Sequence, residues 1–307
     1  MSTSSSPPGT TSATGASSGV PTTARTSGAL PAPAARTVRW EIAIVLGLSL
    51  GKSAVYAVVQ LLDRMSQGPL QDQTTVLNPV LNDRWVFDLT YQLLNIGFAL
   101  VPVLLVMHLV WLRGRNPFRT FGLDLRRPLA DLGWGALLFL AMGLGTLAVY
   151  AGGRALGLTT AIVGNAMDEA WYTVPVLVLS ALRHALVEEV IVVAWLVDRL
   201  AYLQQLRSSG LAAERVPVLP APRLTAAGAH LPIRVTTLVL TLAVLRACYH
   251  LYQGIGPGLG NAVMGVVFVL FYLRYRRVMP LVIAHLLLDV TGFVASPLLA
   301  QLGWLGT

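Results

Sequence analysis

Three polar clusters stand inside otherwise apolar stretches in the C-terminal half of the chain. They are the pair Glu188-Glu189, the pair Arg246 and His250, and the pair His285 and Asp289. An ionisable side chain within a bilayer is energetically costly, so such residues usually mark a working site or an ion pathway. Carboxylates and imidazoles gathered in one region indicate proton transfer or metal chemistry within a membrane.

Helical spacing predicts how the second and third clusters face. His285 and Asp289 are four residues apart, which places them on one helix face, and Arg246 and His250 have the same spacing. A carboxylate beside an imidazole can fix the tautomer of the ring and raise its basicity. Each pair is therefore expected to present both members to the same neighbour.

The two glutamates of the first cluster are expected to serve different purposes. Adjacent residues lie about 100° apart around an α-helix, so Glu188 and Glu189 should not point at the same spot. One would face the reaction centre and the other would need a different partner. The glutamate at the centre can act as a general base for water, and the histidines can orient that water, donate to an oxyanion or hold a metal.

Composition predicts the elements that must position these residues. The chain has 307 residues, of which 55% are hydrophobic and 12% are charged, and the mean hydropathy is +0.66. Soluble domains are about 25% charged. Long apolar runs also argue against a membrane β-barrel, which needs short alternating strands. The sequence therefore predicts an all-α fold, a polytopic transmembrane helical bundle.

Seven apolar stretches are long enough to be spans. They cover about 41–62, 87–112, 131–152, 172–201, 235–253, 258–275 and 279–300. Six to eight spans are possible, because the fourth stretch could be one tilted helix or a helix with a broken piece at Glu188. Four regions follow: a Ser/Thr/Pro/Ala-rich disordered tail (1–38), N-terminal spans (39–170), a core that contains the three polar clusters (171–293), and the end of the last span with the C-terminal tail (294–307).

The positive charge is concentrated in loops between the apolar stretches. The net charge is +8, and arginines cluster after the second, fourth and sixth stretches. This distribution favours anionic lipids as partners over nucleic acid. The positive-inside rule places the N-terminus in the cytoplasm. Lys52 is the single lysine among 22 basic residues, and with abundant Ala this points to a bacterial plasma membrane.

A polar stripe runs along the first apolar stretch. Ser49, Ser53, Tyr56 and Gln60 share a helix face, with Lys52 beside it. The ordinary interpretation is hydrogen bonding between helices. The functional interpretation is that the stripe forms a wall of the catalytic or transport cavity.

The three clusters resemble the motifs of a known family. Residues 171–293 are similar to the CAAX protease and bacteriocin-processing (CPBP, Abi) family of intramembrane endopeptidases, in particular to type II CAAX prenyl endopeptidases. The family pattern is EExxxR, then FxxxH, then Hxxx(N/D), on successive membrane helices. This chain has EEVIVV from residue 188, RACYH from 246 and HLLLD from 285.

The resemblance implies proteolysis of a membrane-associated protein or peptide, and it implies a role for each residue. Glu188 would activate the attacking water, with Glu189 beside it, and His250 would bind or orient that water. His285 and Asp289 would stabilise the oxyanion. If the enzyme uses a divalent metal such as zinc, the ligands to test are Glu188, His250 and His285; a glutamate-only mechanism needs no cofactor.

Two departures from the family pattern affect the first two motifs. Val193 stands where the first motif has Arg, and Arg246 stands where the second has Phe. Our hypothesis is that Arg246 supplies the missing cation to Glu189 from the neighbouring helix, with Arg183 as the competing candidate. His184, four residues before Glu188, is either an additional site residue or a hydrogen-bonded residue of the bundle.

Two other functions remain open at the level of sequence. A non-proteolytic family member, acting as a membrane scaffold or immunity protein, would explain the loss of the first-motif Arg. An ion or metal transporter would use Glu188 and the histidines as a path. A transporter would be expected to distribute polar residues along a whole crossing and to show an internal repeat, whereas this chain shows clustering and no evident repeat.

Overall fold

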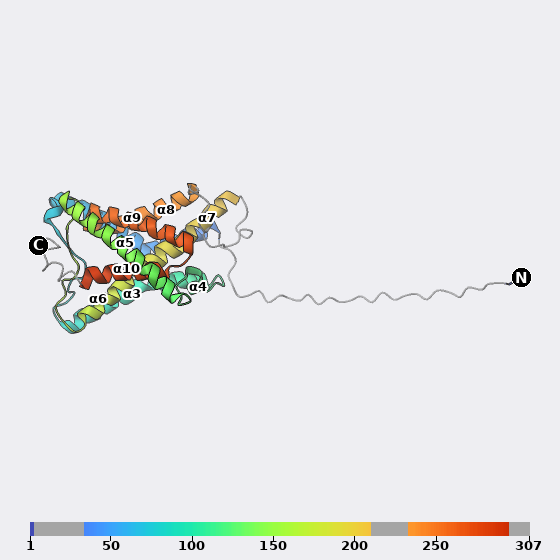
Figure 1. Ribbon diagram of the computed structural model, residues 1–307, viewed down its shortest axis with the longest axis horizontal. Helices are drawn as coiled ribbons and strands as arrows, with labels where there is room; N and C mark the ends of the chain where they lie inside the picture. Colours follow the sequence, from blue (N-terminus) through green and yellow to red (C-terminus); the bar gives the residue numbers. More distant parts are fainter. Residues whose placement is uncertain (3–33, 210–232, 295–307) are drawn as a thin grey trace.

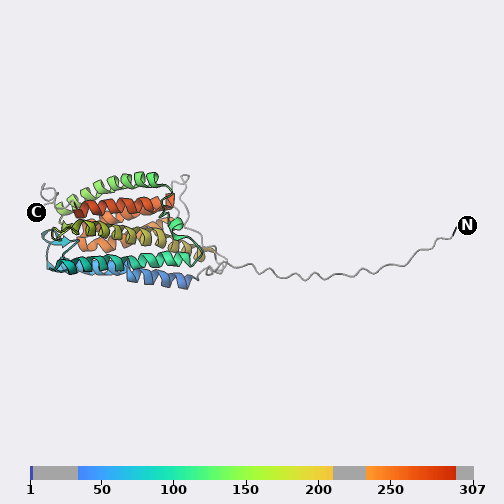
Figure 2. The ribbon, with the colours of Figure 1, turned by 90° about the horizontal axis from the view of Figure 1, so that it is seen from below.

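A computed structural model describes residues 1–2, 34–209 and 233–294 of the chain (Figure 1). The predicted tail falls largely outside these residues, as does the end of the seventh apolar stretch. Within them the fold is a helical bundle with almost no sheet, which confirms the predicted all-α class. Its helices run alongside one another, as Figure 2 shows.

The helices follow the predicted apolar stretches. They are α1 (Ala35–Leu48), α2 (Leu50–Gln67), α3 (Trp85–Trp111), α4 (Pro117–Phe121), α5 (Pro128–Ala155), α6 (Thr173–Leu186), α7 (Val197–Ser209), α8 (Ile233–His250), α9 (Ile255–Tyr275) and α10 (Met279–Val294). A π-helical segment, η2 (Val187–Leu196), joins α6 to α7, and short 3₁₀ turns are η1 (Leu70–Asp72) and η4 (Leu251–Gln253). Strands β1 (Thr74–Val76) and β2 (Ala161–Val163) pair in parallel.

The number of membrane crossings agrees only roughly with the predicted seven. In the described part of the chain, α3, α5, α8 with η4, and α9 are long and apolar enough to cross a membrane. The pair α1 and α2 would make a fifth, but it bends by 54° at Ser49, where a single straight span was expected. Helix α10 is shorter in its described part, and α6 and α7 flank η2 as one continuous helical run.

The core of the bundle is the η2 segment. All of its residues are buried, including Trp195 and Glu189 at 0% exposure. A helix that is apolar on every side, as Val190–Leu196 is, needs neighbours all round, and α3, α9 and α4 pack against it. The outer helices instead expose large apolar side chains such as Phe98 and Leu144, as lipid contact requires. Burial at η2 places the two glutamates at the centre of the molecule.

The arginine-rich segments that follow α3 and α9 meet at one end of the bundle, the end where α4 and α7 lie in Figure 1. Arg113 after α3 bonds Glu41 of α1 at 2.8 Å, and Arg276 after α9 bonds Asp198 of α7 at 2.6 Å. Arg277 binds Asp124, which follows α4. Segments far apart in the sequence therefore share one end, as alternating basic loops require.

The residues at the two ends of α4 allow it to pack closely against the turn after α9. Asn116 caps α4 by accepting a hydrogen bond from the backbone N–H of Arg119, and Gly122 ends the helix with a φ of 66°. A Cβ at Gly122 would lie 2.6 Å from Cα of Arg277, so only glycine allows this close approach. The side-chain hydrogen bond from Arg126 lowers the pKa of Asp124 to about 2, and Arg277 adds to this effect.

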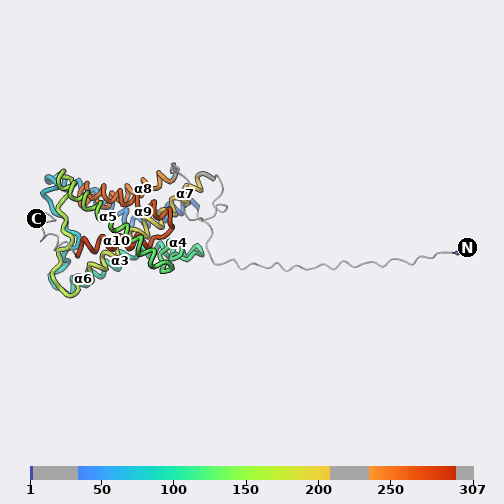
Figure 3. The backbone as a smooth tube through the Cα atoms, viewed as in Figure 1, coloured from blue at the N-terminus to red at the C-terminus, as the bar shows by residue number. Residues whose placement is uncertain are grey.

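Two loops that carry the strands lie at the other end of the bundle. Their course can be followed in the backbone tube of Figure 3. Thr75 of β1 bonds Thr160, the residue before β2, at 2.8 Å. The backbone N–H of Thr160 reaches Gln253 of η4 at 3.3 Å, and Gly254 pairs with Thr159. These contacts fasten the turn that directly follows His250.

Candidate active site

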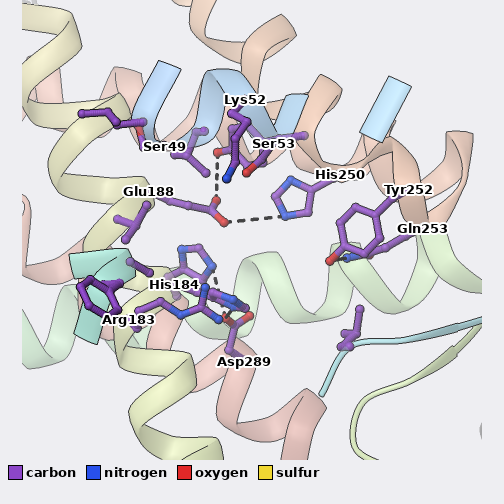
Figure 4. A pocket seen from close by; sticks show the side chains of 18 of the residues that line it. Ser49, Lys52, Ser53, Arg183, His184, Glu188, His250, Tyr252, Gln253 and Asp289 are labelled. Atoms are coloured by element: carbon purple, nitrogen blue, oxygen red, sulfur yellow. Dashed lines mark hydrogen bonds and ion pairs between the residues drawn. The ribbon is translucent and has the colours of Figure 1, made fainter. Parts of the chain in front are cut away.

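A cavity of about 450 Å³ opens beside η2 and brings the three sequence clusters together. Its walls include Glu188, His250, His285 and Asp289, which come from three different helices. Figure 4 shows Glu188 and His250 facing each other across this space, with His184 and Asp289 below them. Segments far apart in the sequence therefore contribute to one cavity.

Arg246 is not part of the cavity lining and contacts both glutamates. Its Nη1 is 2.9 Å from Glu189 Oε1, and its Nη2 is 3.2 Å from Glu188 Oε2. The guanidinium is fully buried, so its charge needs these partners. The contact expected between Arg246 and Glu189 is therefore present. Arg183, the competing candidate, instead donates a hydrogen bond to Ser180 Oγ at 3.2 Å.

Glu188 lines the cavity and Glu189 does not, in agreement with the expectation that only one of the two faces the centre. The accompanying expectation that they cannot point at one spot is wrong. Both carboxylates contact the same guanidinium of Arg246, although they leave η2 in different directions. A guanidinium offers several donors spread over a plane, and a glutamate side chain is long enough to reach round the helix. The adjacent residues converge on one cation without sharing one direction.

A glycine on α9 makes room for the arginine. A Cβ built on Gly265 would lie 3.2 Å from Cδ of Arg246 and 3.2 Å from Cα of Ala243. Helices α8 and α9 therefore approach closely at Gly265. Any larger residue at this position would press on the side chain of Arg246. The position of Arg246 depends on this small residue of the neighbouring helix.

Tyr249 is a site residue that the sequence analysis did not select. Its hydroxyl donates to Glu188 Oε2 at 2.9 Å. The signal was available, because Tyr249 stands three residues after Arg246 and so lies on the same face of α8. Its ring also lies against that of His250, at 4.7 Å between centroids.

His250 is held by its own helix. Its Nδ1 lies 3.0 Å from the carbonyl oxygen of Arg246, which can only accept a hydrogen bond. Nδ1 therefore carries a proton, and in the neutral ring Nε2 is an acceptor. That Nε2 lies 3.9 Å from Glu188 Oε1 across the cavity, the spacing of two groups that share a bridging water.

His285 has acidic groups at both ring nitrogens, and Nη2 of Arg246 also lies 3.4 Å from its Nδ1. Its Nδ1 is 2.7 Å from Glu189 Oε1, and its Nε2 is 3.6 Å from Asp289 Oδ2. Asp289 also contacts His184, whose Nδ1 is 3.3 Å from the same Oδ2. The side chain of His285 is 4% exposed, whereas the side chain of His184 is 30% exposed. One carboxylate thus links a buried imidazole to an accessible one.

The polar stripe of the first stretch contributes to the cavity in part. Ser49, Lys52 and Ser53 line it, and the ammonium of Lys52 projects into it in Figure 4. Tyr56 does not belong to its lining and is 63% exposed. The bend at Ser49 brings the beginning of α2 against η4, which explains why the stripe contacts the cavity near that bend.

A metal fits this arrangement poorly. Among the described residues, Glu188, Glu189 and His285 offer ligand atoms within 4.8 Å of one another, a group that does not include the predicted ligand His250. The guanidinium of Arg246 already contacts both carboxylates, so a dication held between them would meet a fixed positive charge. Glu189 and His285 also already bond each other.

The site belongs to a helical membrane protein in which buried charges gather at one cavity. Residues 170–291 match a family model described as "Type II CAAX prenyl endopeptidase Rce1-like", so that segment is similar to this family. The family supports a CAAX-type intramembrane endopeptidase in general. The comparisons found no match among curated proteins or solved structures.

Proposed function

We propose that the protein is an intramembrane endopeptidase in which Glu188 activates water to hydrolyse a peptide bond of a membrane-associated protein or peptide. The observation that carries this proposal is the 3.9 Å gap between Glu188 Oε1 and His250 Nε2, inside a cavity of the Rce1-like segment. A water bridging the two would donate one hydrogen to each acceptor, which directs its oxygen lone pair away from both and toward a substrate carbonyl.

The first step is attack by this water. Glu188 takes a proton as the water oxygen bonds the carbonyl carbon, and His250 fixes the direction of attack. Tyr249 and Arg246 both contact Glu188 Oε2 and leave Oε1 to face the water. The cation is supplied by Arg246 in place of the arginine that Val193 replaces.

His285 acts mainly through its neighbours in this proposal. Because both of its ring nitrogens face carboxylates, it holds Glu189 and Asp289 in place rather than donating into the cavity. The stabilisation of the oxyanion predicted for His285 and Asp289 then falls to the cations of the cavity wall, Lys52 and Arg183. Neither forms an ion pair with another described residue in this structure.

The setting proposed for this chemistry is a bacterial plasma membrane, with the arginine-rich end in the cytoplasm and next to anionic lipids. Several of these arginines come together from separate loops at that end, which supports a single basic face. Nucleic acid is not among the proposed partners. The substrate is a peptide segment that reaches the cavity from the membrane.

The test is cleavage by the purified protein in liposomes. The probe is an internally quenched peptide that ends in a farnesylated CAAX sequence, chosen from the description of the family. Wild type should cleave it, and Glu188→Gln should lose about a thousandfold or more, because an amide cannot take the proton. Asp198→Asn, at the arginine-rich end, is the matched control and should keep its activity. Equal cleavage by wild type and Glu188→Gln would refute the mechanism, and no cleavage by wild type would favour a scaffold or immunity protein.

A further inference from the structure

His184 is the accessible histidine of the cavity that the family motifs do not include. It lines the cavity with Glu188, four residues further along, so the two side chains leave the helix on the same face. Figure 4 shows it on the opposite side of the cavity from His250. A substrate bond attacked from the Glu188–His250 side would therefore have its leaving group near His184.

The contacts of His184 prepare one of its nitrogens to carry a proton. Nδ1 lies 3.3 Å from Asp289 Oδ2, a carboxylate oxygen that accepts, so Nδ1–H donates. No other hydrogen bond joins His184 to a described residue, and its side chain is 30% exposed. The arrangement leaves Nε2 to exchange protons with whatever occupies the cavity, while Asp289 stabilises the charged ring.

The other imidazoles of the cavity are engaged in different ways. His285 has carboxylates at both ring nitrogens and is 4% exposed, so it cannot reach a substrate without breaking those contacts. His250 directs Nε2 at Glu188, on the side from which water attacks. Expulsion of an amine needs a proton donor close to the amide nitrogen, and His184 is the imidazole whose free nitrogen is available for it.

We propose that His184 is a further catalytic residue, the general acid that protonates the leaving amine; this inference rests on the proposed function. After water has added and Glu188 has taken its proton, the C–N bond breaks and its electron pair stays on nitrogen. That nitrogen takes the proton from Nε2 of the charged His184 ring. The proton held by Glu188 then passes through water to His184, which restores both groups, and the sum is one peptide bond and one water consumed.

The experiment compares two probes that differ in the leaving group. One is the farnesylated CAAX peptide with its scissile amide, and the other is its depsipeptide, in which an ester oxygen replaces the amide N–H. An alkoxide leaves more readily than an amide anion, so ester cleavage needs the acid less. The variant His184→Asn keeps a side-chain N–H for Asp289 but removes the proton-transferring nitrogen. His108→Gln on α3, an exposed histidine, is the matched control.

The expected result for His184→Asn is a loss of about a hundredfold in amide cleavage, with ester cleavage within about fivefold of wild type. His108→Gln should cleave both probes as wild type does, and Glu188→Gln should lose both. Amide cleavage by His184→Asn at the wild-type rate, or equal losses on both probes, would overturn the inference while leaving Glu188 as the base. If wild type cleaves neither probe, the proposed function fails and this inference fails with it.

Discussion

Two places in the molecule share one arrangement, an arginine held between two carboxylates, and differ in what surrounds it. Arg246 joins Glu188 to Glu189 beside the cavity, and Arg277 joins Asp124 to Asp131 at the arginine-rich end. The second cluster links the turn after α9 to the α4–α5 loop and the beginning of α5. No histidine contacts it among the described residues, and none of its members lines the cavity.

The difference teaches that the paired charges alone do not define a reactive site. At Arg277 every carboxylate contact serves to connect segments, as a structural ion pair does. At Arg246, Glu188 keeps one oxygen directed at a cavity and an imidazole, so a carboxylate remains to react. The cation is equally necessary in both clusters, because an unpaired buried carboxylate is costly.

Removing the arginine of each cluster should produce the largest difference between the two clusters. Arg246→Leu should lower the cleavage rate of the folded protein by about a hundredfold or more, as much as Glu189→Ala, because it leaves two buried carboxylates without their cation. Arg277→Leu should lower the melting temperature yet keep the rate of the folded fraction within about twofold. Melting curves and rates per folded molecule check both. Full activity in Arg246→Leu would show that the two clusters are alike.

A second change asks whether the cation must come from α8. Adding Val193→Arg to Arg246→Leu places a guanidinium where the family motif has it, and should restore about tenfold of the lost activity. The recovery should be partial because Val193 is buried in a packed core, which resists a larger side chain. Val193→Met in the same background separates charge from bulk. Equal recovery with Met would remove the electrostatic explanation.

A third change acts on the arginine indirectly. Gly265→Val should push against Arg246 or separate α8 from α9, with a loss of about tenfold in cleavage and a lower melting temperature. Gly145→Val on α5 is the matched control, since a Cβ there meets nothing within 4 Å. Cleavage rates of the two variants in the same liposomes check the expectation. Equal rates would mean that the close helix approach does not position Arg246.

The smallest expected effect is the pH dependence of the arginine-rich end. Asp124 has a pKa lowered from 3.8 to about 2 in the folded protein. A lowered folded pKa stabilises above the unfolded value, so this contribution is complete above about pH 4 and is lost as the pH falls toward 2. Asp124→Asn should therefore differ in unfolding temperature from wild type at pH 6 and lose most of that difference near pH 2. A difference that persists at pH 2 would contradict the assignment.

Much of this arrangement was predictable because lipid restricts what a chain can do. Long apolar runs with few charges predict helices, because a helix satisfies its own backbone hydrogen bonds in lipid. The i,i+4 spacing correctly placed His285 near Asp289. The spacing rule failed for Glu188 and Glu189, because it describes where side chains leave a helix and not how far they reach. It also gave no sign of the π-helical segment that carries them, because the apolar pattern of residues 187–196 is the same for an α-helix and a π-helix.

Contacts between distant segments were the hardest to foresee. Tyr249 was within reach of helical spacing, yet its bond to Glu188 depends on how α8 approaches η2. The bend at Ser49 is flanked by Gly47 and Gly51, and a Cβ at Gly51 would lie 2.8 Å from the carbonyl oxygen of Leu46. Glycines inside an apolar stretch do not by themselves show that a helix bends there, so the sequence predicted one span. The number of membrane crossings agrees only roughly because α10 is described only as far as Val294 and because η2 divides the α6–α7 run into separate segments.

The most direct test of the central claim, that Arg246 rather than a metal is the cation of this site, is cleavage of the farnesylated CAAX peptide after exhaustive chelation. The metal content of the same sample is measured alongside. The rate should stay within about twofold of the untreated protein, since the general base and its cation are both side chains. Loss of cleavage on chelation, with recovery when zinc is returned, would contradict it.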